Sequence, residues 1–448
     1  MSKIYSYHTF YFPFVWNMES IEYEDYVKSF SSTLWKCTND DYDTIISADS
    51  DSDIDLEKKY RKYHYFSRSA REIVGGMGGG FVTNLTYDSK NVHNKAKYII
   101  KTKDKEYELL LNAIRLKVYN TGIAIFIFEC KNSLYTTIDD VKCINEYGRR
   151  VFAPFLGASS VMCADKMGIK YQDRESFADL ENKFCLKTEG AVDINYIPEF
   201  ITELLPLSVR KNIVPAIDDR MFIACLVNDE KYAERVTDYP QREDVSEDLY
   251  EFIFVNKPAF CGCINESERL NQLDGAIYKR WLGKKGEGVT LWGVTHNSFM
   301  GVTSVDADYL VELPFLCLYT EILALVICQR ASILRFDYLA SELSRGFEKK
   351  GRNLRTRKIK DLVFLQEKYI AFLNQFMNCE ITSQEQGIEI YNMIQEKTDI
   401  DRAISHLSEE IRIMYEEAGV IQNFNIGKYG AIVAVAALLL QIAEWIIG

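Results

Sequence analysis

Two groups of charged residues in this sequence have side chains suited to binding an anionic, hydroxyl-bearing ligand. Arg149 and Arg150 are adjacent in the stretch EYGRRVF. Asp218, Asp219 and Arg220 are adjacent in PAIDDRMF, directly before an apolar run. Guanidinium groups bind phosphate through paired N–H donors, whereas carboxylates accept hydrogen bonds from hydroxyl or amino groups. Both stretches are therefore candidate ligand-binding sites.

The same charges have a structural interpretation. On a helix the side chains of Arg149 and Arg150 diverge by about 100°, so one would face a ligand and the other a neighbour. The arginines and aspartates are equally suited to forming internal ion pairs, with one another included, and the sequence leaves both interpretations open. Lower-ranked ligand-binding candidates are Asn145, Tyr147 and the run His296, Asn297 and Ser298.

Signatures of metal sites and of catalysis are weak. Cys261 and Cys263 form one C-x-C pair without a second pair, and the five histidines do not cluster. The acidic run 49–55 alternates like a calcium loop, but Ile54 and Tyr60 stand where that loop needs Gly and Glu. The glycine run IVGGMGGGF matches no phosphate-loop pattern and predicts a flexible turn. No nucleophile–base pair is evident, so we expect neither an enzyme, nor a resident metal, nor a cofactor.

Composition narrows the class of protein. The chain has 448 residues and a formal net charge of −12, which argues against direct nucleic-acid binding because that requires a basic surface. The 11 cysteines follow no regular spacing, which favours a reducing, cytoplasmic setting for the bulk of the chain. The N-terminus MSKIYSYHTFYFPFVW lacks the features of a signal peptide.

The elements that would position the charged groups alternate between residues 60 and 305. The runs AKYIIK, GIAIFIFEC, MFIACLV and YEFIFV predict strands, whereas IDDVKCINEYGRRVF and IPEFITELLP predict helices. This alternation predicts an α/β domain with a central sheet over residues 1–305.

After residue 305 the pattern becomes helical. The apolar run 313–329 contains Pro314 and Glu321 and is short for a membrane span, so we predict a buried helix. The basic stretch 345–360 is interpreted as a solvated or inter-subunit loop, followed by a helix near 356–378. Overall, we expect an α+β protein in which a helical bundle and stalk over 306–428 lead into a terminal helix.

A heptad pattern marks the third helix of this region. Ile400, Ile404, Leu407, Ile411, Met414, Ala418 and Ile421 are spaced alternately by four and three residues. This spacing favours either self-association or packing within a bundle of the same chain. No proline follows residue 382, so we expect one stalk helix from about 384 to 428.

The final segment, 429–448, has the character of a membrane span. From Tyr429 to Ile447 the strongly polar residues are Gln441 and Glu444, and 19 helical residues extend about 28 Å, close to the thickness of the hydrocarbon core. Tyr429 and Trp445 lie near the two ends, as interfacial aromatic residues do. We expect the chain to lie in the cell inner membrane with its bulk in the cytoplasm.

Gln441 and Glu444 are the candidate pore residues. Polar groups within a span usually face a helix interface or a water-filled path, although Glu444 is near enough to the end to reach the interface. One span cannot enclose a pore by itself. A channel would therefore need a ring of identical chains.

The arrangement of domains resembles the CorA magnesium transporter superfamily. The stretches INEYGRRVF, IVPAIDDRMFIAC, QRASILRF and TSQEQGIEIY are similar to those of a bacterial CorA-like membrane protein family. Some members of that family accompany type III CRISPR systems as membrane effectors in antiviral defence. The resemblance implies a homo-oligomer, a pentamer in this superfamily, gated by a nucleotide second messenger that joins S-adenosylmethionine to AMP.

Two departures from that superfamily keep alternatives open. The Gly-Met-Asn signature is absent, with AEWIIG in its place, and a second span is missing unless the natural chain is longer. Because that signature forms the loop that recognises the hydrated ion, the resemblance does not by itself imply Mg²⁺ selectivity. A transporter of Mg²⁺ or another divalent cation and a non-conducting membrane scaffold are the alternative functions.

Overall fold

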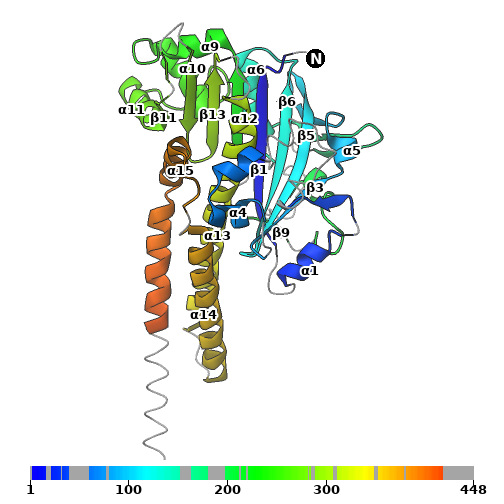
Figure 1. Ribbon diagram of the computed structural model, residues 1–448, viewed down its shortest axis with the longest axis vertical. Helices are drawn as coiled ribbons and strands as arrows, with labels where there is room; N and C mark the ends of the chain where they lie inside the picture. The colour runs from blue at the N-terminus through cyan, green and yellow to red at the C-terminus, as the bar shows by residue number, and fades with distance from the viewer. Residues whose placement is uncertain are drawn as a thin grey trace, which may run out of the picture. The chain divides into compact units, whose positions relative to one another are not determined.

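We describe the protein from a computed structural model (Figure 1). It describes residues 3–16, 22–31, 33–39, 60–76, 80–151, 163–179, 197–210, 213–217, 220–280, 282–283, 288–305, 310–347, 352–377 and 380–416. The predicted membrane segment 429–448 lies outside these residues.

Thirteen described strands form one mixed sheet. The strands are β1 (Ser6–Trp16), β2 (Trp35–Cys37), β3 (Val82–Tyr87), β4 (Lys97–Lys101), β5 (Glu106–Tyr119), β6 (Ile123–Asn132), β7 (Lys166–Lys170), β8 (Glu175–Asp179), β9 (Ile213–Pro215), β10 (Phe222–Asn228), β11 (Ile277–Tyr278), β12 (Thr290–Val294) and β13 (Ser298–Thr303). Their main order is β11-β12-β13-β10-β1-β6-β5-β4-β7-β8, while β3 also pairs with β5 and β2, and β9 pairs with β1.

The sheet corrects the expected α/β character of the body. Among the described strands only β10 and β13 pair in parallel, and every other pair is antiparallel. The protein is therefore a mixed α+β fold rather than one built from repeated βαβ units.

Strand β1, the first described element, lies in the middle of the sheet (Figure 1). Its aromatic residues are buried on both faces, as expected for an internal strand. Pro13 is tolerated in β1 because it lies between two pairing partners on one side of the strand. Strand β10 pairs with β1 as far as Tyr11, and β9 pairs with it from Phe14. The missing N–H of Pro13 falls in that gap, and its carbonyl accepts from Ala216 N at 3.0 Å.

Helices cover both faces of the sheet. The labelled helices are α1 (Tyr23–Lys28), α4 (Arg68–Val74), α5 (Ser89–Val92), α6 (Ile138–Gly148), α8 (Glu199–Thr202), α9 (Glu230–Val236), α10 (Glu243–Ile253), α11 (Glu266–Ala276), α12 (Glu312–Pro314), α13 (Thr320–Phe347), α14 (Arg352–Phe372) and α15 (Glu385–Lys397), with π-helical turns η1 (Phe315–Tyr319) and η2 (Leu373–Met377). Residues 60–65 and 400–416 are helical as well. Helices α6, α9 and α10 share a core with Phe10 and Ile223 on one face. On the other face Trp292 stacks on Phe315, and Tyr11 donates to the carbonyl of Thr320.

The run YEFIFV, residues 250–255, is not a strand, which corrects the prediction made there. Its first four residues end α10, whose residues Val245, Leu249, Phe252 and Ile253 are buried, and its last two form a turn. A short apolar run does not distinguish a buried strand from a buried helix, and here the spacing upstream decides for the helix.

The apolar run 313–329 forms a buried helix, as predicted. The continuous helix Glu312–Arg345 is long and apolar enough to cross a membrane, and 72% of its most apolar stretch is buried. Glu321 fixes its register on the sheet: its carboxylate lies 2.7 Å from both Arg115 Nη1 and Lys117 Nζ and 3.3 Å from Lys62 Nζ. Burial opposes ionisation of Glu321, but these cations outweigh it and hold the pKa of its carboxyl well below the usual range.

The chain divides into two compact units, and the division falls within α13. One unit, the body, comprises Met1–Ser332 and Gln375–Ile400; the other, the helical unit, comprises Ile333–Asn374 and Asp401–Gly448. The predicted boundary at residue 305 therefore lies earlier in the chain than this division. The helix α13 belongs to both units.

Two details of the helical region correct the sequence analysis. The basic stretch 345–360 was expected to be a loop, but most of it is helical: α13 continues to Phe347 and α14 begins at Arg352. The many Lys and Arg residues of this stretch are compatible with a helix because both are good helix formers. The predicted stalk is not one helix: α15 ends at Lys397, and a turn at Thr398 and Asp399 precedes a helix over 400–416. Asp399 has a φ of +56°, which a continuous helix cannot include.

Candidate functional site

A cavity of about 350 Å³ opens in the body where strands β1, β10 and β13 meet the start of α12. This volume is at the lower end of the range for small-molecule sites, about 300–1,000 Å³. The cavity is lined by Lys3, Ile4, Tyr7, Asn228, Glu230, Thr303, Ser304, Val305, Val311 and Glu312.

Sheet topology explains why polar residues gather at this place. Strands β10 and β13 run in parallel and end together, with Asn228 opposite Thr303. Strand β1 runs antiparallel to β10 and begins at the same edge, so Tyr7 lies near those ends. Ligands of open sheets usually bind beyond the carboxyl ends of parallel strands, because the chain leaves the sheet there and opens a crevice.

The lining can accept hydrogen bonds and bind positive charge. Glu230 and Glu312 supply carboxylates, Lys3 supplies an ammonium group, and Thr303 and Ser304 supply hydroxyls. Two carboxylates and one ammonium give the described lining a formal charge of −1. The geometry therefore suits the hydroxyls and the cationic part of a ligand, and Lys3 adds one positive charge to the lining.

Tyr7 connects the cavity to the long helix. Its hydroxyl donates to Glu312 Oε1, and Glu312 is the first residue of the helix that continues through η1 and α13. A ligand that competes for the Glu312 carboxylate would therefore act on the first turn of that helix.

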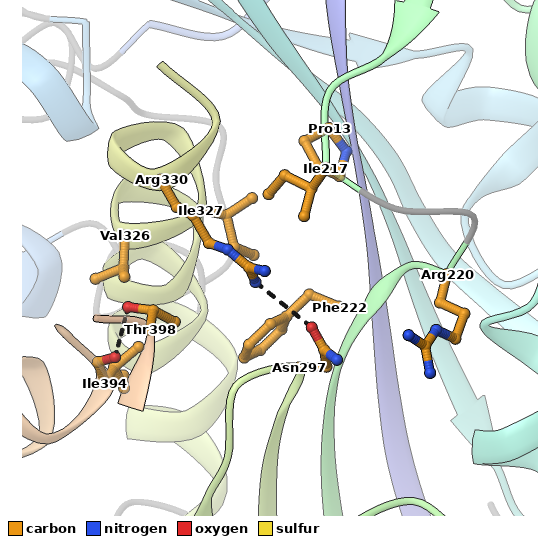
Figure 2. A pocket seen from close by; sticks show the side chains of 10 residues that line it. All are labelled: Pro13, Ile217, Arg220, Phe222, Asn297, Val326, Ile327, Arg330, Ile394 and Thr398. Carbon is orange, nitrogen blue, oxygen red and sulfur yellow. Dashed lines mark hydrogen bonds between the residues drawn. The ribbon is translucent and has the colours of Figure 1, made fainter. Parts of the chain in front are cut away.

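A second, much smaller cleft lies between strand β10 and helices α13 and α15 (Figure 2). It brings together Arg220, a predicted ligand residue, and Asn297, a lower-ranked one. Arg330 donates to Asn297 Oδ1 at 3.4 Å and to the carbonyl of His296 at 3.2 Å. The cleft volume is about 10 Å³, room for roughly one water molecule and not for a nucleotide.

Arg149 and Arg150 both bind the carboxylate of Glu146. Arg149 Nη2 lies 2.7 Å from Oε2, and Arg150 Nη2 lies 2.8 Å from Oε1. Arg149 is 4% exposed and also donates to the carbonyl of Val255 at 3.1 Å. This is the internal ion pair that the sequence left open, with Glu146 as the partner. Phosphate binding by these arginines stays a prediction, and it would require Glu146 to release one of them.

The companion residues have different environments. Asn145 is buried, and its Oδ1 lies 2.7 Å from His8 Nδ1. Tyr147 is half-buried, and burial raises the pKa of its phenol. The predicted ligand residues Asp218 and Asp219 and the predicted pore residues Gln441 and Glu444 lie outside the described residues.

Sequence reasoning missed the residues of the larger cavity. They come from four separate segments, 3–7, 228–230, 303–305 and 311–312, and none of them belongs to a charged motif. The one usable signal is that Asn228 and Thr303 each end an apolar, strand-like run, which identifies a sheet edge but not its neighbours.

Comparison of the chain with models of known families, with curated proteins and with solved structures finds no match in any of the three. A function is therefore inferred from the geometry of the described residues and from the sequence motifs.

Proposed function

We propose that this protein is an oligomeric, membrane-anchored effector of the CorA-like type, gated by a nucleotide second messenger in antiviral CRISPR defence. The body binds the messenger, and the helices transmit the change to the terminal segment 429–448, which forms a pore in a ring of chains. The observation that carries the sensing part is that the cavity wall contains Glu312, the first residue of a helix that belongs to both units.

The ligand chemistry fits the S-adenosylmethionine–AMP conjugate that the resemblance implies. The carboxylates of Glu230 and Glu312 suit ribose hydroxyls and the positive amino and sulfonium groups, and Lys3 suits a phosphate. Because the cavity is small, we expect it to hold one end of the conjugate.

Gating requires that the ligand bind one state of the protein more tightly than another. The hydrogen bond from Tyr7 to Glu312 supplies a contact that a bound ligand can replace. Replacement would shift the first turn of the helix, and a packed helix passes such a shift along its length.

Binding by the full chain in detergent tests the sensing claim. We expect the conjugate to bind in isothermal titration calorimetry and Glu230→Gln or Glu312→Gln to weaken binding about tenfold or more, since a hydrogen bond to a charged group contributes roughly 1.5–3 kcal/mol. The matched control is Glu266→Gln on α11, away from the cavity. Arg149→Ala tests the alternative site and needs a parallel measurement of stability. Absence of binding by the intact oligomer would refute the sensing claim.

Flux through liposomes separates the three functions. Flux that requires the conjugate supports the effector, and we then expect Glu444→Gln to change conductance. Flux of Mg²⁺ or another divalent cation without nucleotide supports the transporter. The observation that favours this alternative is the cavity lined by carboxylate and hydroxyl oxygens, which are the ligands that such cations prefer. An oligomer whose liposomes stay sealed under every ligand is a scaffold. Type III CRISPR genes beside the gene for this chain would favour the effector.

A further inference from the structure

Three side chains in the helical unit form a group with metal-binding chemistry. Asp337 belongs to α13, and His406 and Glu410 belong to the helix over 400–416. One ligand atom from each side chain lies within 4.8 Å of the other two.

The two helices hold these side chains in register. His406 and Glu410 are four residues apart and therefore lie one turn apart on the same face. The residue after each of them, Leu407 and Ile411, is buried. His406 itself is exposed, so the group lies at the solvent-accessible edge of the helix contact.

None of the three side chains has a hydrogen bond or an ion pair within the described part of the chain. The nearby cation Arg412 is engaged elsewhere, with its Nε donating to Glu409 Oε2 at 2.9 Å and a second contact to Glu416. The two carboxylates therefore bring a formal charge of −2 to one place beside an imidazole. A divalent cation bound there would neutralise this charge.

We propose that Asp337, His406 and Glu410 bind a divalent transition-metal ion of the Zn²⁺ class. Zn²⁺ takes imidazole nitrogen and carboxylate oxygen at about 2.0–2.2 Å, with water in a fourth position. Ligand atoms around such an ion are about 3.4 Å apart, a closure that small side-chain rotations supply. Mg²⁺ and Ca²⁺ prefer oxygen ligands, so the imidazole selects against them. The ion would fasten α13 to the 400–416 helix, whether or not the protein conducts ions.

The test is metal binding by the full chain in detergent, after treatment with a chelator. We expect calorimetric titration with ZnCl₂ to give one ion per chain and Co²⁺ to show the visible absorption of a low-coordinate site. We expect His406→Gln and Glu410→Gln each to weaken Zn²⁺ binding by about 10–100-fold, while Mg²⁺ does not compete.

Glu409→Gln is the matched control, because it changes an adjacent carboxylate that pairs with Arg412. We expect this variant to bind Zn²⁺ like the wild type, with circular dichroism confirming the fold of every variant. Stoichiometric Zn²⁺ binding that survives the folded Asp337→Asn, His406→Gln double variant would overturn the proposal and assign the ion to other ligands. Neither nucleotide nor flux enters this measurement, so its result is independent of the proposed function.

Discussion

At the scale of single residues, polar groups in the core of the body form hydrogen-bonded chains. The Nε2 atom of His8 lies 2.9 Å from Ser6 Oγ, and its Nδ1 atom lies 2.7 Å from Asn145 Oδ1. The side-chain amide of Asn132 donates a hydrogen bond to the same Ser6 hydroxyl. This arrangement resembles a nucleophile–base pair, but all four side chains are almost fully buried. A reactive group must reach its substrate, so the network is structural.

His8 predicts a pH dependence of stability. Burial lowers its pKa to about 4, from 6.5 in the unfolded chain. Between these values the unfolded state binds a proton that the folded state does not, so stability is complete above pH 6.5 and falls as the pH drops. The loss should reach about 3 kcal/mol at pH 4.

Denaturant unfolding of the body, followed by tryptophan fluorescence from pH 7 to pH 4, measures this effect. In the wild type the free energy of unfolding should fall as the pH drops, and we expect His8→Gln to remove most of the part of this pH dependence that His8 contributes. His64→Gln, at an exposed position, should keep the pH dependence of the wild type. Equal slopes for the wild type and His8→Gln would contradict the assignment.

At the scale of elements, the heptad seam is used within the chain. Leu407, Ile411 and Met414 are buried in the isolated chain, and the hydroxyl of Tyr369 on α14 bonds Ser408 beside them. Of the two interpretations that the sequence left open, this packing supports the bundle for residues up to 416. Periodicity defined the buried face but not its partner, because helices from the same chain and from another chain bury the same stripe.

Leu407→Ala distinguishes a bundle core from a subunit interface. We expect it to destabilise the helical unit by about 2–5 kcal/mol, the usual range for a buried leucine, and to leave the oligomer intact. Thermal unfolding and light scattering after size exclusion measure the two quantities. Ser405→Ala, at an exposed position of the same helix, is the control. Dissociation without loss of stability would instead place the seam between subunits.

At the scale of the whole molecule, the proposal depends on assembly and on a membrane. The helical unit exposes several large apolar side chains, which are candidates for a contact between copies: Leu334, Tyr338, Phe364, Ile370, Ile413 and Tyr415. Most of the apolar stretch of the helix Glu312–Arg345 is buried, so the proposed function places membrane attachment in the segment 429–448.

Removal of residues 429–448 should release the protein from the membrane. The segment carries nearly all the apolar length that a span needs, whereas the remainder of the chain keeps its packed body. Fractionation of cells that express the truncated chain measures this, with the full chain as the reference and the Glu444→Gln chain as a control that keeps the segment. Membrane retention of the truncated chain after a carbonate wash would show that another segment anchors the protein.

Sequence by itself determined the features that depend on nearby residues. The strands at 97–101 and 222–228, the helix at 138–148 and the buried helix after 312 follow from local periodicity and composition. Only the tertiary structure decided which side chains share a site. The sequence did not show that Arg149 forms an ion pair with Glu146. The neighbours of Glu312 in the cavity and of Asp337 in the candidate metal site come from other segments of the chain, in some cases hundreds of residues away. The reason is physical: a local pattern fixes which face of an element is buried, but the hydrogen-bond register and helix packing decide what meets that face.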